Sequence, residues 1–272
     1  DSDLFLPEKS WSADRARCRA ADIPDDVVYR PKSEIALELY RHAVANGIHF
    51  DWLTFDEWYG SKPSFLAELE RLGQLYVAEA PCSTPCWPTL PTYHSMQAPF
   101  AAKRADNAGR YSPVFKRQKW RTMKIRRKTF PPQSWRVKAA QVHLSRGGLP
   151  TDRRYWLLVA RNVDTGEMKY FLSNAPPRTA LKTLLGVAFT RANVEHVFRV
   201  AKSEIGFSHF EGRGYVGLMR HMILCQLVMT FIAEQTDRLR GEKPGDHLGT
   251  SRSGAQHRLP PMAPAWLPAL AS

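Results

Sequence analysis

Cysteine is scarce in this chain. The four cysteines, at positions 18, 82, 86 and 225, are too few and too scattered for a disulfide framework. Cys82 and Cys86 also lack a second Cys or His pair at zinc-finger spacing, which argues against a zinc site. A reducing cytoplasm is therefore the expected setting.

Long apolar runs are also missing. No stretch has the composition of a secretory signal, and the longest apolar stretch, residues 221–233, is too short to cross a bilayer and contains Gln226. This stretch predicts a buried helix in a soluble protein that has no membrane partner. The sequence has no Gly-x-Ser-x-Gly elbow, Walker loop or paired-His metal motif, which disfavours an unrelated hydrolase.

Negative charge is in deficit. The 272 residues carry a formal net charge of +13, and 43% of them are hydrophobic, enough for a substantial core. An excess of Lys and Arg indicates a polyanionic partner, because these side chains neutralise phosphates and release condensed counterions. Nucleic acid is the leading candidate. A membrane surface is the weaker one, because no basic amphipathic helix stands out.

Periodicity and turn residues predict an α/β protein. Residues 31–78 show the order helix, strand, helix, strand, with helices that begin near Pro31 and Pro63 and strands at 50–55 and 75–78; this order is typical of a parallel sheet. Further strands are predicted at 135–144, 154–162 and 168–172, and helices at 179–191, 192–203 and 214–238. Beyond Gly241 the periodicity ends, which predicts a disordered tail.

A basic segment interrupts this pattern at residues 81–133. Its cations alternate with aromatic residues, an arrangement that suits a surface that binds phosphates and stacks on bases. A solvated loop is the alternative. The cations include Lys119, Arg121, Arg126 and Arg127, and the aromatics are Tyr111, Phe115, Trp120 and Phe130.

Two carboxylates stand out as candidates for chemistry. Asp56 follows a predicted strand, where open α/β sheets place ligand-binding groups, although such residues are often turn or cap residues. On the helix predicted at 192–203, Glu195 aligns with Arg191 and Lys202 at the margin of an apolar face. That alignment indicates either a metal ligand with two phosphate-binding neighbours or a surface salt-bridge ladder. The apolar face consists of Val194, Val197, Phe198, Ala201 and Ile205.

Several motifs together resemble bacterial insertion-sequence DDE transposases. Residues 50–60 (FDWLTFDEWYG) are similar to the strand that carries the second catalytic Asp of that family. Arg191, Glu195 and Lys202 are similar to its arginine–glutamate–lysine signature. Residues 6–11 (LPEKSW), 23–26 (IPDD), 206–213 (GFSHFEGR) and 220–221 (RH) also resemble the family, so that the likeness covers residues 4–236.

The resemblance implies a partial RNase H-like fold, a mixed sheet with flanking helices, interrupted by a β-rich insertion. It implies core segments at 1–80 and 177–238, a basic loop and β-rich insertion at 81–176 and a tail at 239–272. In such enzymes three carboxylates hold two divalent metals that drive attack on a DNA phosphate. Asp56 and Glu195 are the implied catalytic metal ligands, with Mg²⁺, or Mn²⁺, as the ion. Arg191 and Lys202 are the implied contacts to DNA, both element ends and target.

Two departures bear on activity. Ala188 stands where the signature carries a tyrosine, and the first catalytic Asp of the family is not in this chain. We therefore expect an N-terminally truncated transposase with reduced or no strand cleavage and transfer, from an enzyme that is a homodimer when complete and associates with the bacterial nucleoid. The alternative is a non-catalytic DNA-binding remnant of a decayed mobile element. Glu204 is the alternative to Glu195 as the third carboxylate.

Overall fold

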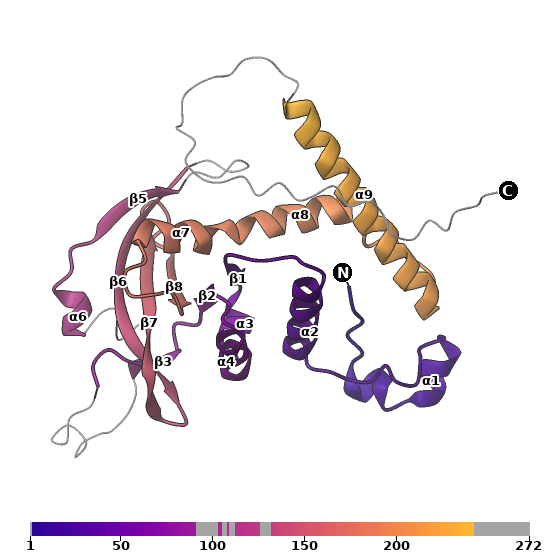
Figure 1. Cartoon of the computed structure of the whole chain (residues 1–272), viewed down its shortest axis with the longest axis horizontal. Helices are drawn as coiled ribbons and strands as arrows, with labels where there is room; N and C mark the ends of the chain where they lie inside the picture. Colours follow the sequence, from indigo (N-terminus) through magenta and orange to yellow (C-terminus); the bar gives the residue numbers. More distant parts are fainter. Residues whose placement is uncertain (1, 91–102, 105–107, 109–111, 126–131, 242–272) are drawn as a thin grey trace. The chain divides into compact units, whose positions relative to one another are not determined.

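The structure is a computed structural model that describes residues 2–90, 103–104, 108, 112–125 and 132–241 (Figure 1). Residues 1–230 and 231–272 form two separate units. Within the second unit the described residues continue the last helix, and the predicted disordered tail lies outside the described residues.

The N-terminal residues form short helical elements around a small apolar cluster. Asp14 accepts a hydrogen bond from the backbone N of Arg17 and so caps α1. Leu6, Cys18 and Ile23 are buried in the cluster, against which Tyr215 packs. The elements of this region are the π-helical turn η1 (Glu8–Ser12), α1 (Arg15–Ala20) and α2 (Lys32–Ala45).

The predicted helix, strand, helix, strand order is confirmed. Pro31 precedes α2 and Pro63 begins α4, and the two strands of this region pair in parallel, with Phe55 opposite Ala78. Gly73, with a φ of 72°, turns the chain after α4. The elements are β1 (Leu53–Phe55), the short helix α3 (Glu57–Gly60), α4 (Pro63–Arg71) and β2 (Tyr76–Ala80).

One mixed sheet joins this parallel pair to a long antiparallel meander. The strand order is β1-β2-β8-β7-β6-β3-β4, with β5 also paired to β6. Only β1 and β2 run parallel among the described strand pairs. The remaining elements are β3 (Pro85–Trp87), β4 (Lys103–Arg104), α6 (Pro113–Lys116), β5 (Arg121–Ile125), β6 (Gln133–Arg146), β7 (Leu149–Asn162) and β8 (Met168–Ser173).

Helices cover both faces at the β1–β2 end of the sheet. Val77 faces α7 (Leu181–Thr190) in a cluster with Leu184 and Leu185, whereas Tyr76 and Ala78 pack with residues of α2 and α4. The alternation along β2 explains this division, because successive side chains of a strand point to opposite faces. The result is the predicted mixed α/β architecture, a curled mixed sheet flanked by helices, which is compatible with part of an RNase H-like fold.

The predicted segments at 1–80 and 81–176 contribute strands to the same sheet. Strand β2, in the segment at 1–80, pairs with β8, in the segment at 81–176, over four residues from Val77 to Ala80. The helices α7, α8 (Ala192–Ser203) and α9 (Tyr215–Gly241) follow. The division into a core and an insertion remains a prediction.

Two predictions about buried helices are wrong. The apolar face predicted for α8 is largely exposed, with Phe198 49% accessible and Ala201 the one buried residue of the helix. Helix α9 is also exposed, with Leu224 and Leu227 each 61% accessible. Apolar periodicity predicts which residues share a face, but no described element of the chain covers these two faces. By length and composition Tyr215–Thr236 is able to cross a membrane, but a single helix with these properties is weak evidence for a membrane-spanning segment.

Candidate functional site

Asp56 lies at the carboxyl end of β1, where it caps α3. Its Oδ1 accepts hydrogen bonds from the backbone N of Trp58 at 3.1 Å and of Tyr59 at 3.2 Å. The side chain is exposed. Burial, and in second place the charge of Asp56, raise the pKa of Tyr59. Asp56 is thus a helix cap whose second carboxylate oxygen has no hydrogen-bond partner among the described residues.

The short helix after Asp56 packs directly on β2. A Cβ atom at Gly60 would lie 2.1 Å from the carbonyl oxygen of Glu79, so only glycine allows this approach. Because Phe55 pairs with Ala78, the next residues along the two parallel strands are Asp56 and Glu79. The register and the packing of Gly60 therefore bring Glu79, which sequence reasoning did not single out, to the same edge of the sheet as Asp56.

Glu79 connects the sheet to helix α8. Its Oε1 lies 2.7 Å from Lys169 Nζ, and its Oε2 lies 3.3 Å from Arg191 Nε. Arg191 also reaches Glu195, with 2.8 Å between Nη1 and Oε1. The Glu79 side chain is 16% exposed and that of Arg191 22%, whereas that of Glu195 is 61% exposed. One guanidinium therefore links a shielded carboxylate to an accessible one.

Arg191 holds this position because α7 passes into α8 without a break. Its backbone, at φ −51° and ψ −37°, is helical, and the two helices lie end to end (Figure 1). Glu195 is four positions after Arg191, which places the two residues on consecutive turns of one face. The alignment inferred from the sequence for these two residues is confirmed as an ion pair.

A polar cavity of about 190 Å³ lies beside this ion pair. Its lining includes Glu79, Lys169, Arg191 and Glu195, together with Ala188 at the position of the absent signature tyrosine. Asp56 does not line it. Across the described ranges, no three His, Cys, Asp or Glu side chains group closely enough to hold a metal ion.

Lys202 and Glu204 lie at the other end of α8. Both are exposed, and Glu204 is the C-cap residue. Nine positions separate Glu204 from Glu195, which corresponds to about 13 Å along a helix. The structure therefore brings Arg191 and Glu195 together, but it leaves Lys202 and Glu204 apart from the cavity.

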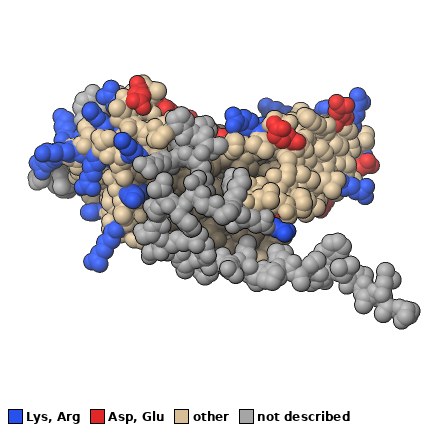
Figure 2. Space-filling model, turned by 90° about the horizontal axis from the view of Figure 1, so that it is seen from above, with Lys and Arg blue, Asp and Glu red and all other residues tan. Residues whose placement is uncertain are grey.

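A cationic surface lies on α6, on the edge strand β5 and on the adjoining parts of β6 and β7. Arg136 on β6 pairs with Thr122 on β5 and lies opposite Arg161 on β7. Like charges opposite one another destabilise a sheet, so this register favours a bound anion. Figure 2 shows Lys and Arg side chains crowded at the left of the view, the side on which Figure 1 places α6 and β5. We call this end of the sheet, together with α6, the basic face. Its exposed cations point to both faces of the sheet, because Arg121 and Lys124 are three residues apart on β5. The exposed cations are Lys116, Arg117, Lys119, Arg121, Lys124, Arg136 and Arg161.

The predicted aromatic residues of this segment are only partly available for stacking. Phe115 is fully buried in the core and cannot stack on a base. Trp120 is 40% exposed, and Lys138 Nζ lies 4.9 Å from the centre of its ring. Tyr111, Phe130, Arg126 and Arg127 lie outside the described residues.

These observations define an α/β protein with a polar cavity at one end of a mixed sheet and a basic face around its edge strand β5. The sequence model of a family described as DDE superfamily endonuclease matches residues 1–141, more than half of the 272 residues. The chain belongs to this family. No curated protein matches it. The matched residues contain Asp56 and Glu79, whereas Arg191 and Glu195 lie beyond them. The family implies DNA as the substrate and a nuclease or transposase type of function, and its members generally use divalent metals.

Proposed function

We propose that this chain is a DDE-type transposase domain of an insertion sequence, which cleaves and transfers DNA strands at a site built on Asp56 and Glu195. The observation that carries the proposal is the link from Glu79 through Arg191 to Glu195. It ties the helix that carries the accessible carboxylate of Glu195 to Glu79, the residue next to Asp56 in the register of β1 and β2. Arg191 and Glu195 are also the first two residues of the signature.

The donor chemistry fits a divalent metal. Carboxylate oxygens are the ligands that Mg²⁺ and Mn²⁺ prefer, and the hydrogen bonds and ion pair of the two residues use only Oδ1 of Asp56 and Oε1 of Glu195. Asp56 and Glu195 would hold the ion, with a further carboxylate needed to complete the family's set. A bound metal supplies the charge that activates the nucleophile and stabilises the leaving oxygen.

Lys and Arg side chains of the chain orient the catalytic carboxylate and bind DNA. Arg191 orients Glu195, and Lys202 contacts a DNA phosphate further along α8. The basic face, including Lys119 and Arg121, binds the duplex without reading its sequence, because phosphate contacts carry no sequence information. Arg126 and Arg127 extend the same run of cations in the sequence. The protein then acts as a homodimer on two DNA ends in the bacterial cytoplasm, at the nucleoid.

Nicking of supercoiled plasmid in Mg²⁺ or Mn²⁺ tests this function. We expect Asp56→Asn and Glu195→Gln to lower nicking by at least about 100-fold while DNA affinity stays within about 2-fold. The matched control is Glu204→Gln, which removes another exposed carboxylate, at the far end of α8, and leaves nicking unchanged. Full activity in Asp56→Asn or Glu195→Gln overturns the site.

The basic face supports a second candidate function, DNA binding without catalysis, as in a remnant of a mobile element. The same assay separates the two. A chain that binds plasmid but does not nick it in either metal, and whose carboxylate variants bind equally well, is such a binding protein.

A further inference from the structure

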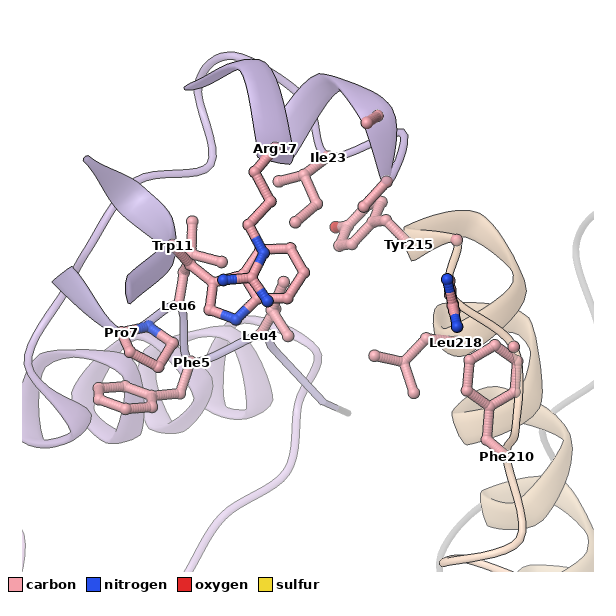
Figure 3. A pocket seen from close by; sticks show the side chains of 15 residues that line it. Leu4, Phe5, Leu6, Pro7, Trp11, Arg17, Ile23, Phe210, Tyr215 and Leu218 are labelled. Carbon is pink, nitrogen blue, oxygen red and sulfur yellow. The ribbon is translucent and has the colours of Figure 1, made fainter. Parts of the chain in front are cut away.

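The proposed function leaves two sequence motifs without a role, residues 6–11 and 206–213. The structure places both in the lining of one cavity of about 660 Å³, a volume in the range of small-molecule sites. In Figure 3, Leu4, Trp11 and Arg17 lie on one side of this cavity, and Phe210 and Leu218 lie across from them. We call it the N-terminal cavity.

The two walls of the N-terminal cavity are fixed to one another. The backbone N of Tyr215 donates a hydrogen bond of 2.8 Å to the carbonyl oxygen of Ala21, and the Tyr215 ring packs on the buried cluster around Leu6. Phe210 is held by close backbone packing, because a Cβ atom at Gly212 would lie 2.5 Å from its ring. The hydrogen bond and the packing therefore hold the N-terminal cavity open as part of the fold.

The lining combines flat apolar surfaces with positive charge. Arg17 lies over the Trp11 ring, 3.9 Å from its centre, and donates a hydrogen bond of 2.9 Å to the carbonyl oxygen of Ser10. Arg17 and Trp11 both line the cavity, so together they present an aromatic ring and a positive charge to it. The side chain of Arg213 is exposed and makes no ion pair within the described residues. The fifteen described lining residues include these two arginines and no carboxylate.

We propose that the N-terminal cavity binds one unpaired nucleotide of DNA, an inference that rests on the proposed function because DNA must be the substrate. The base stacks between the Arg17–Trp11 pair and Phe210, and Arg213 binds its phosphate. Aromatic rings and guanidinium planes are the surfaces on which unstacked bases bind, and they tolerate any base because every base has a π-face. An unpaired nucleotide has two sources, a single-stranded end and a base extruded from the duplex.

Fluorescence binding assays with 2-aminopurine distinguish these sources. The probes are a fully paired duplex, the same duplex with one bulged 2-aminopurine, and the same duplex with a short single-stranded overhang that ends in 2-aminopurine. We expect the full chain to bind at least one unpaired probe about 10-fold more tightly than the paired duplex, with quenching of the 2-aminopurine. The probe that shows this preference identifies the source.

Two variants locate the binding in the cavity. Ala20→Phe fills it from an exposed position of its lining, and Arg213→Gln removes the phosphate contact; both abolish the preference and the quenching. The matched controls, Ala16→Phe on the same helix and Arg220→Gln on α9, are exposed positions outside the lining and leave both readouts unchanged.

The outcomes for the cavity and for the proposed function are separate. Binding to the paired duplex without any preference for an unpaired base overturns the cavity proposal alone, as does a preference that Ala20→Phe and Arg213→Gln both retain. Binding to the unpaired probes without binding to the paired duplex supports the cavity and contradicts the basic face. Absence of binding to all three probes overturns both.

Discussion

Glu79 on β2 and Arg191 at the start of α8 form an ion pair, with 3.3 Å between Oε2 and Nε, that fastens the helix to the sheet. Both side chains are less than a quarter exposed, so solvent screens this pair less than a surface pair. Because Arg191 also binds Glu195, the pair sets the position of the accessible carboxylate.

Removing the charge of Glu79 is expected to destabilise the fold. Glu79→Gln leaves Lys169 and Arg191 without their shared carboxylate and lowers the free energy of unfolding by about 1–3 kcal/mol, as for hydrogen bonds to charged groups. Urea denaturation measures this change. The control is Glu167→Gln, whose carboxylate is 54% exposed and 3.7 Å from Lys169, and which costs less than about 1 kcal/mol. Equal losses of stability in both variants contradict the conclusion that the shielded ion pairs of Glu79 stabilise the fold more than the exposed pair of Glu167.

The proposed catalytic role of Asp56 can be separated from its role as a helix cap. Asn accepts the same capping hydrogen bonds, whereas Ala cannot, so Asp56→Ala lowers the free energy of unfolding by about 1 kcal/mol and Asp56→Asn by much less. Both variants lose plasmid nicking. Thermal unfolding and the nicking assay, run on the same preparations, check this pattern. Recovery of nicking in Asp56→Asn shows that Asp56 is only a cap.

Replacing two glycines with alanine is expected to change the free energy of unfolding in opposite directions. Gly60→Ala places a Cβ atom 2.1 Å from the Glu79 carbonyl oxygen, and the resulting overpacking lowers the free energy of unfolding by about 1–3 kcal/mol. Gly186→Ala, in α7, meets no atom within 4 Å and raises it by about 0.5–1 kcal/mol through helix propensity. Chemical denaturation of the two variants measures both values. Stabilisation by Gly60→Ala contradicts the close packing of α3 on β2.

Salt dependence tests the basic face. If Arg121 and Lys124 each contact a phosphate, replacing either with Gln makes the negative slope of log K against log salt concentration shallower by about 0.9. Titration of duplex DNA at several salt concentrations gives this slope. Arg178→Gln removes an exposed cation outside the basic face and serves as the control. A slope that the three variants change equally shows that net charge alone, and not this surface, binds DNA.

Alkaline pH is expected to weaken a hydrogen bond of 2.8 Å that the hydroxyl of Tyr155, on β7, donates to Oε2 of Glu70, on α4. Burial, together with the hydrogen bond to Glu70, raises the pKa of Tyr155 from 10.0 to about 12. The folded state therefore favours the protonated phenol, so this contribution to stability is complete below pH 10 and is lost as the pH rises toward 12. Tyr155→Phe is about 1 kcal/mol less stable at neutral pH and loses less stability between these pH values. Identical alkaline slopes of both proteins contradict this role.

The order of elements outside the basic segment at 81–133 was predictable, because local sequence patterns determine it, whereas β3, β4, α6 and β5 within that segment were not predicted. Pro31 and Pro63 mark helix starts, and the helical period placed Arg191 beside Glu195. Glu79 was not predictable in the same way. Its partners Lys169 and Arg191 come from distant segments, and only the parallel pairing of β1 with β2 places it next to Asp56. A charged residue in the otherwise buried strand Tyr76–Ala80 was the one local signal.

Burial was the least predictable property. The sequence shows that Val197 and Phe198 share a helix face, but not whether another element covers that face, and both are nearly half exposed. Phe115 shows the opposite error, because its cationic neighbours suggested a surface whereas its ring fills the core. In both cases tertiary contacts, rather than local composition, determine exposure.

The unbroken helical backbone at Arg191 has a mechanical consequence. Helices α7 and α8 form one rod, buried at the α7 end by Leu184 and Leu185 and exposed along most of α8. Arg191 lies where the buried part of this rod passes into the exposed part, and its ion pair with Glu79 adds a polar attachment to the apolar packing of α7 on the sheet. Lys202 lies about 16 Å beyond Arg191 at 1.5 Å per residue, so a force that bound DNA exerts on Lys202 would act on the same exposed helix that carries Glu195.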